Sequence, residues 1–160
     1  MTSATATATV DSDGYDSESG TATPTMRLEL AWCLPRQAAT VSMARRLLTT
    51  ALHLIGAAEE CRADLALAVT EACANAVRHA HGASEYQIII TADPDRCVVE
   101  VTDRGVGVDH KRLHTGLDRT PRSLTERGRG LRLIRACTDT VEIGTVFPHG
   151  VAVRMVKTLT

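Results

Sequence analysis

The stretch TEACANAVRHA, residues 70–80, is the most informative part of this 160-residue chain. It ends an apolar pattern that predicts a helix over residues 59–80. At about 100° per residue, one arc of roughly 40–60° gathers four polar side chains: Asp64, Glu71, Asn75 and Arg78. Glu71 and Asn75 lie one turn apart and present a carboxylate beside an amide oxygen, which suits a divalent cation and an activated hydroxyl. A solvated polar face is the alternative interpretation of the same pattern.

A second stretch, CVVEVTDRGVG over residues 97–107, joins an apolar strand to two glycines. Asp103 closes the strand and offers a fixed hydrogen-bond acceptor. Gly105 and Gly107 allow positive φ and a close approach of the backbone to a flat ligand. The alternative is a plain turn, since Asp and Gly both favour turns.

A third stretch, RGRGL over residues 127–131, opens a short predicted helix. Backbone N–H groups at a helix N-terminus bind anions, and nearby arginines add positive charge. A flexible helix start is the alternative. The stretch is neither a P-loop, because no G-x-x-x-x-G-K-[ST] occurs in the chain, nor a dinucleotide fingerprint.

Periodicity outside these stretches predicts a helical part followed by strands, an α+β layer arrangement. Residues 1–25 are rich in Ser, Thr, Ala and Asp and are expected to form a disordered tail, which leaves residues 26–160 as one domain. The remaining predicted strands are residues 27–32, 85–92, 96–103, 140–144 and 151–156. The remaining predicted helices are residues 41–55 and 129–137.

Composition narrows the function classes. The formal net charge is -1, so no bulk basic field points to nucleic acid or to a membrane surface. No run approaches the roughly 20 apolar residues that cross a bilayer, and the N-terminus lacks a secretory pattern, so we expect a cytoplasmic protein. The five cysteines contain no CxxC pair and favour reduced thiols. Cys73 lies on the apolar side of its helix and is interpreted as an inert core thiol.

Taken together, the three stretches resemble the motifs of the GHKL ATPase superfamily. Residues 70–80 resemble its N-box, residues 103–107 its first glycine box, and residues 128–131 its second. The likeness covers residues 27–159 and is greatest to the stand-alone anti-sigma factor serine kinases of the SpoIIAB and RsbW type. It implies a Bergerat-type two-layer sandwich, with a mixed, mostly antiparallel sheet and helices on one face.

The resemblance also implies roles for single residues in binding ATP and Mg²⁺. Asn75 would hold Mg²⁺, and Asp103 would accept a hydrogen bond from the adenine amino group. Glu71 would be the general base that takes the proton of an attacking protein serine. Residues 108–127 would form a lid over the nucleotide. The other residues implied in nucleotide binding are Gly105 and Gly107 at the base, and Arg78, Arg127, Gly128, Arg129, Gly130 and Leu131 near the phosphates.

The function implied by the resemblance is that of an ATP-dependent serine kinase acting as an anti-sigma factor. Such a protein phosphorylates a STAS-domain anti-anti-sigma protein, sequesters an RNA polymerase sigma factor, and forms a homodimer, here expected through the first strand and helix. Three alternatives remain. The chain could bind ATP and a partner without transferring phosphate. It could instead be an interaction protein that has lost nucleotide binding. A histidine kinase catalytic domain is disfavoured, because the region before Met26 is too short and polar to supply a phospho-accepting helix pair.

Overall fold

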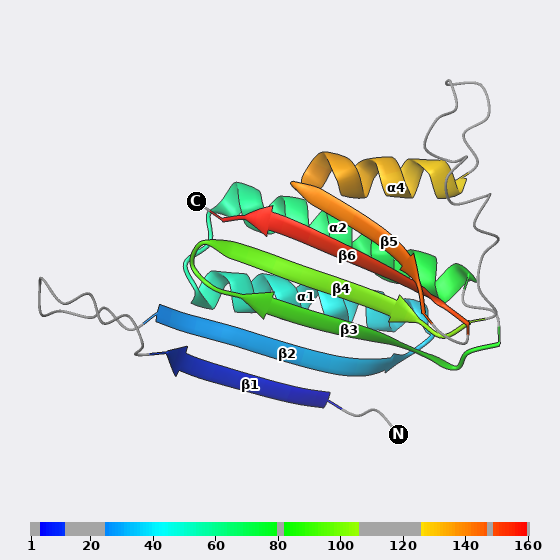
Figure 1. Ribbon diagram of the computed structural model, residues 1–160, viewed down its shortest axis with the longest axis horizontal. Helices are drawn as coiled ribbons and strands as arrows, with labels where there is room; N and C mark the ends of the chain where they lie inside the picture. Colours follow the sequence, from blue (N-terminus) through cyan, green and yellow to red (C-terminus); the bar gives the residue numbers. More distant parts are fainter. Residues whose placement is uncertain (1–3, 12–24, 80–81, 106–125, 147–148, 160) are drawn as a thin grey trace, which may run out of the picture.

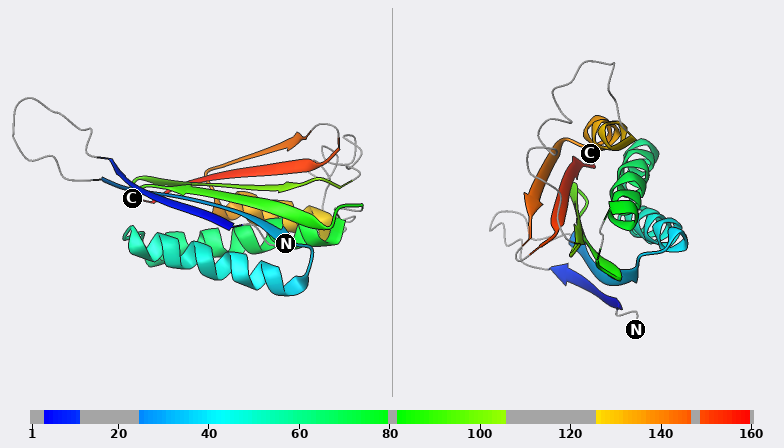
Figure 2. Two further views of the ribbon diagram at one scale, coloured as in Figure 1. Left: turned by 90° about the horizontal axis from the view of Figure 1, so that it is seen from below. Right: turned by 90° about the vertical axis from the view of Figure 1, so that its right-hand side faces the viewer.

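The computed structural model describes residues 4–11, 25–79, 82–105, 126–146 and 149–159. They form two layers, a six-stranded sheet and a set of helices that cover one of its faces (Figures 1 and 2). The strands follow the order β1-β2-β3-β4-β6-β5 across the sheet. The bounds are β1 Ala4–Asp11, β2 Thr25–Pro35, α1 Ala38–Leu54, α2 Glu59–His79, β3 Glu85–Ala92, β4 Arg96–Asp103, α4 Glu126–Cys137, β5 Thr140–Thr145 and β6 Val151–Thr158.

The α+β sandwich with helices on one face is confirmed. Strands β3 and β4 have the bounds that alternation predicts, because each strand turns every second side chain toward the helices. The expected sheet was mixed and mostly antiparallel, and every strand pair among the described residues is antiparallel. The connection from β2 to β3 runs through both α1 and α2, and it returns the chain beside β2 in the opposite direction.

Strand β1 lies where the sequence led us to expect only a disordered tail. It pairs with β2 from Ala4 opposite Trp32 to Asp11 opposite Thr25. Its residues alternate Ala and Thr, and Thr is a β-branched residue that favours strands. An edge strand is held by backbone hydrogen bonds to one neighbour, so it forms without the large apolar side chains whose absence suggested disorder. Residues 12–24 lie outside the described part of the chain.

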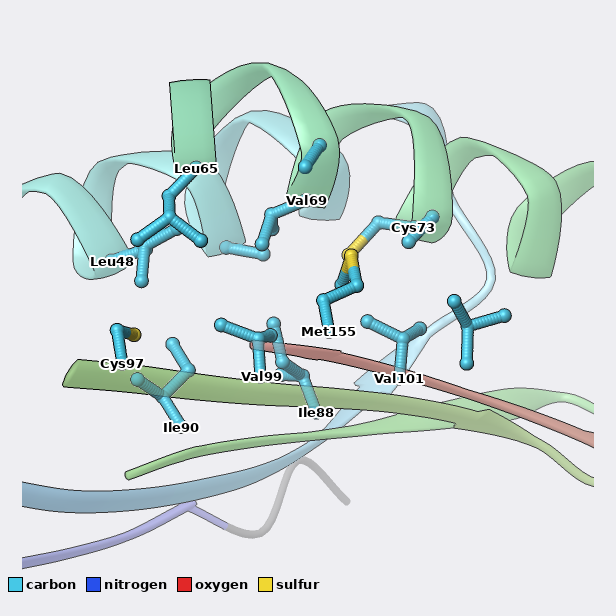
Figure 3. Packing of buried hydrophobic residues seen from close by; sticks show 14 of the residues in the cluster. Leu48, Leu65, Val69, Cys73, Ile88, Ile90, Cys97, Val99, Val101 and Met155 are labelled. Carbon is cyan, nitrogen blue, oxygen red and sulfur yellow. The ribbon is translucent and has the colours of Figure 1, made fainter. Parts of the chain in front are cut away.

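The core fills the space between the sheet and the helices. Leu65, Val69 and Cys73 point from α2 toward Ile88 and Val99 on the sheet (Figure 3). Burial raises the pKa of the Cys73 thiol to about 12, so that thiol stays protonated and unreactive at neutral pH. The prediction of a core thiol is therefore confirmed.

Three element ends meet at one end of the molecule. The C-terminal ends of β4 and α2 and the N-terminal end of α4 lie on the same side in Figure 1. These ends carry the three sequence stretches singled out above, so the fold gathers them from positions more than 50 residues apart in the chain (Glu71 to Gly130). No helix in the described ranges has the length and apolarity needed to cross a membrane.

Candidate functional site

Gly130 brings α4 against the polar face of α2. A β-carbon placed on Gly130 would lie 3.0 Å from Glu71 Oε2, 3.4 Å from Asn75 Nδ2 and 3.7 Å from Asn75 Oδ1. Since 3.0 Å is shorter than an ordinary van der Waals contact, a β-carbon at this position would require the Glu71 carboxylate to shift, whereas its distances to Asn75 are those of ordinary contact. The arrangement brings together three of the residues that the sequence predicts for the site: Glu71, Asn75 and Gly130.

Glu71 stays open to solvent in this arrangement. Its side chain is 28% exposed, and the Arg78 guanidinium lies 4.0 Å from Oε2. Arg78 also donates from Nε to the carbonyl of Ala74 at 3.2 Å, which holds it along its own helix. An exposed ion pair at this distance contributes little stability. The Glu71 carboxylate therefore remains free to accept a proton from a bound group.

Asp103 ends β4 as a half-buried acceptor. Its Oδ1 accepts from the Gly105 N–H at 3.0 Å, and the Val151 N–H of β6 donates to the same carboxylate. Burial raises the pKa of Asp103, while these two donors and the positive charge of Arg36 act against that rise. The backbone on both sides of the carboxylate thus fixes its direction before any ligand binds.

Gly150 is a residue of this site that the sequence analysis missed. Its φ of +141° is a conformation that L residues rarely adopt, and a β-carbon there would collide with the carbonyl oxygen of Asp103. Only glycine lets the start of β6 approach the end of β4 this closely. A glycine directly before the predicted final strand was the available signal.

Arg36 is the second missed residue, and no motif marks it. It follows β2 and donates from Nε and Nη2 to the carbonyl of Val77 at 3.2 and 2.7 Å. Its Nη1 donates to the carbonyl of Ala83 at 2.9 Å. Through these bonds it joins the β2–α1 junction to the end of α2.

The remaining predicted residues divide between described and undescribed parts of the chain. Gly105 is buried, Arg129 is exposed and Leu131 is half-buried. Gly107 and the expected lid, apart from residues 126–127, lie outside the described residues. Helix α4 begins at Glu126 rather than at Arg129, so Arg127 and Gly128 lie inside its first turn. The N–H groups without intrahelical partners are consequently those of residues 126–129.

The oxygen atoms of Asn75 and Glu71 fit a magnesium ion whose other ligands are phosphate oxygens and water. Asn75 and Glu71 supply hard oxygen atoms, and Gly130 leaves room beside them. The described residues contain no group of three or more His, Cys, Asp or Glu side chains able to hold a metal on its own. Mg²⁺ commonly binds with one or two protein ligands plus phosphates and water, which matches this sparse set.

The chain is similar to known proteins both in sequence and in fold. The family described as the histidine kinase-like ATPase domain matches residues 34–157. The serine-protein kinase RsbW of Bacillus cereus (strain Q1) is 29% identical over 131 residues, which cover 78% of this chain and 81% of that protein. The protein of the same name in Bacillus mycoides (strain KBAB4) is 28% identical over the same shares. The crystal structure of the SiaB-SiaC complex from Pseudomonas aeruginosa superposes with a TM-score of 0.63 at 16% identity, covering 79% of this chain and 87% of that one, and shows a shared fold.

Proposed function

Since this chain belongs to the histidine kinase-like ATPase domain family, we propose that it is an ATP-dependent protein serine kinase. The observation that carries the proposal is the close approach of Gly130 to Glu71 and Asn75. A carboxylate, an amide group and the first turns of α4 lie close together at this contact, which supports the proposal. The name serine-protein kinase borne by the relatives supports the same activity.

The nucleotide would lie between α2, α4 and the end of β4. Asp103 accepts a hydrogen bond from the adenine amino group, with Gly105 and Gly107 lining the base pocket. The N–H groups at the start of α4 would bind the phosphates, and three arginines would add positive charge there: Arg78, Arg127 and Arg129. Asn75 Oδ1 would hold Mg²⁺, and the ion would supply charge neutralisation on the phosphate oxygens.

Glu71 would act as the general base. The substrate serine oxygen forms a bond to the γ-phosphorus while the bond from that phosphorus to the β–γ bridging oxygen breaks. The serine proton passes to the Glu71 carboxylate, which its partial exposure leaves available. Positioning and charge neutralisation supply most of the remaining catalysis in phosphoryl transfer.

The protein partners in this proposal are a STAS-domain anti-anti-sigma protein, which receives the phosphate, and an RNA polymerase sigma factor, which the chain sequesters in the cytoplasm. A homodimer through the first strand and helix needs one adjustment. The strand predicted first is β2, and both of its edges are already paired, with β1 and β3. The dimer contact would therefore use β1 and the outer side of α1, where Met43 and Leu54 are exposed.

The experiment is a phosphotransfer assay with labelled ATP, Mg²⁺ and a cognate STAS-domain protein as the phosphate acceptor. Glu71→Gln should lower the transfer rate by about 10²–10⁴-fold while ATP still raises the melting temperature. Glu60→Gln, an exposed glutamate near the other end of α2, is the matched control and should transfer at the wild-type rate. Unchanged transfer in Glu71→Gln would refute the base assignment.

A second candidate is an ATP-binding regulatory module that transfers no phosphate. The Arg78 guanidinium, 4.0 Å from Glu71 Oε2, favours it, because an arginine beside the carboxylate competes with a substrate hydroxyl for that oxygen. This second candidate predicts that the wild type transfers no phosphate but is still stabilised by ATP. ATP at a hundredfold excess over its Kd should then add about 2.7 kcal/mol to the free energy of unfolding. If ATP does not raise the free energy of unfolding, the chain is an interaction protein that has lost nucleotide binding.

A further inference from the structure

Arg36, which directly follows β2, is hydrogen-bonded to the end of α2 and to the residues just before β3. Its guanidinium binds the Val77 carbonyl of α2 through two nitrogens and the Ala83 carbonyl through the third. Its backbone N–H donates to the Ser84 carbonyl at 2.9 Å. Both its side chain and its backbone therefore hold the chain between α2 and β3.

The Val77 carbonyl is one of the four at the end of α2 that have no partner inside the helix. It lies two residues after Asn75, so its position fixes the turn that carries the amide. A guanidinium presents five N–H donors in a rigid planar fork, whereas an ammonium group is a compact charge with three donors on a flexible stem. Arg36 thus acts as the cap of α2 from a distant part of the chain.

Leu34, two residues before Arg36, pairs with Tyr86 of β3, and Tyr86 pairs with Asp103 of β4, so Arg36 follows the row of the sheet that carries Asp103. The positive charge of Arg36 favours the charged form of that carboxylate. Other titratable side chains also lie on the elements around Asp103, and none of them is changed in the variants described below. They are His79 on α2, Glu85 and Tyr86 on β3, Arg104 after β4 and His149 before β6. Arg36 is thereby in reach of both halves of the site, the turn of α2 and the end of β4.

We propose that Arg36 is a positioning residue for nucleotide binding, which fixes the Asn75 turn of α2 relative to Asp103 by bonding both the end of α2 and the residues just before β3, the strand that pairs with the end of β4. The inference rests on the proposed function, because it assigns Asn75 to the metal–phosphate half and Asp103 to the adenine half. Arg36 touches neither the metal nor the base in this account. It sets the spacing between the groups that do.

The test measures ATP–Mg²⁺ affinity by calorimetry in the full chain across a pH series. Arg36→Met, which removes both the bonds and the charge, should weaken binding about tenfold. Arg36→Lys, which keeps the charge but not the planar fork, should weaken it only a few-fold. Leu28→Ala is the stability control, because Leu28 is buried opposite Ala92 at the other end of the sheet. It should lower the melting temperature and leave ATP affinity unchanged.

The pH series separates positioning from a purely structural effect. ATP binding should be lost on acidification, as Asp103 takes up a proton. Without the Arg36 charge the pKa of Asp103 rises further, so the acid midpoint of binding in Arg36→Met should move to higher pH. The midpoint in Arg36→Lys should stay at the wild-type value.

Wild-type affinity and midpoint in Arg36→Met would overturn the inference, and so would an equal loss of affinity in Leu28→Ala. If Arg36→Met does not fold, Arg36→Lys decides: full affinity there overturns the positioning role of the fork. A wild-type chain that binds no ATP would refute the proposed function itself, and this inference with it. A wild type that binds ATP beside an unaffected Arg36→Met would refute the inference alone.

Discussion

Opposing influences act on the single carboxylate of Asp103. Burial disfavours its charge, whereas the N–H groups of Gly105 and Val151 and the charge of Arg36 favour it. Burial is the largest of these influences, so the pKa lies above its ordinary value. The Asp103 carboxylate is therefore partly desolvated in the ligand-free protein, and such a carboxylate is suited to accept a hydrogen bond from a ligand.

Asp103→Asn should therefore raise the melting temperature of the ligand-free protein at neutral pH. A folded-state pKa above the unfolded value means that stability falls as the pH rises from the unfolded pKa through the folded one. Asn does not titrate, so its advantage over the wild type should grow across that window. Thermal unfolding from about pH 4 to pH 7 measures this, with the unfolded pKa near 3.9. The same variant should bind ATP more weakly; a lower melting temperature at neutral pH would contradict the argument.

Gly130 permits a second test with a single atom. Gly130→Ala puts a methyl group against Glu71 Oε2, so it should weaken ATP binding and phosphotransfer. Because Ala favours a helix interior over Gly by about 1 kcal/mol, the free energy of unfolding should not fall much. Gly144→Ala is the control, since a β-carbon on Gly144 meets nothing within 4 Å. Full activity in Gly130→Ala would show that the crowding has no consequence.

At the scale of elements, the site depends on how β6 meets β4. Val151 pairs with Asp103, and the glycine before it packs on the Asp103 backbone. This contact fixes the register of the last strand at the point where the carboxylate is held. Helix α4 is placed by a comparable contact, that of Gly130 with α2.

Gly150→Ala should disturb that register. A positive φ at a residue other than glycine costs about 1–3 kcal/mol, and the collision with the Asp103 carbonyl adds to this cost. Gly56→Ala is the matched control, because Gly56 has φ +78° but nothing within 4 Å, so it carries the conformational cost alone. Urea unfolding compares the two variants. If both variants lose the same free energy of unfolding, the collision with the Asp103 carbonyl adds nothing to the conformational cost.

At the scale of the whole molecule, the sheet separates an outer edge from the site. β1 pairs only with β2 and lies three positions from β4 in the strand order. Antiparallel neighbours share hydrogen bonds directly, whereas strands three positions apart do not. The edge and the site should therefore respond independently to mutation.

Deletion of residues 1–24 removes β1 and should leave ATP affinity unchanged. The β2 amides that had paired with β1 lose their partners and should exchange hydrogen faster. A fall in ATP affinity would mean that β1 supports the site through the sheet.

The sequence by itself determined the elements and the chemistry on them. Periodicity predicted α2 with its polar arc, and alternation predicted β3 and β4, because both depend on neighbours along the chain. Only the tertiary structure decided that Gly130 meets Glu71, that Gly150 meets Asp103, and that Arg36 reaches the end of α2. Those contacts join residues distant in the chain, and their partners are fixed by packing and register, which no local pattern contains. The pairing of β1 was missed for the same reason, since its partner is another strand rather than the core.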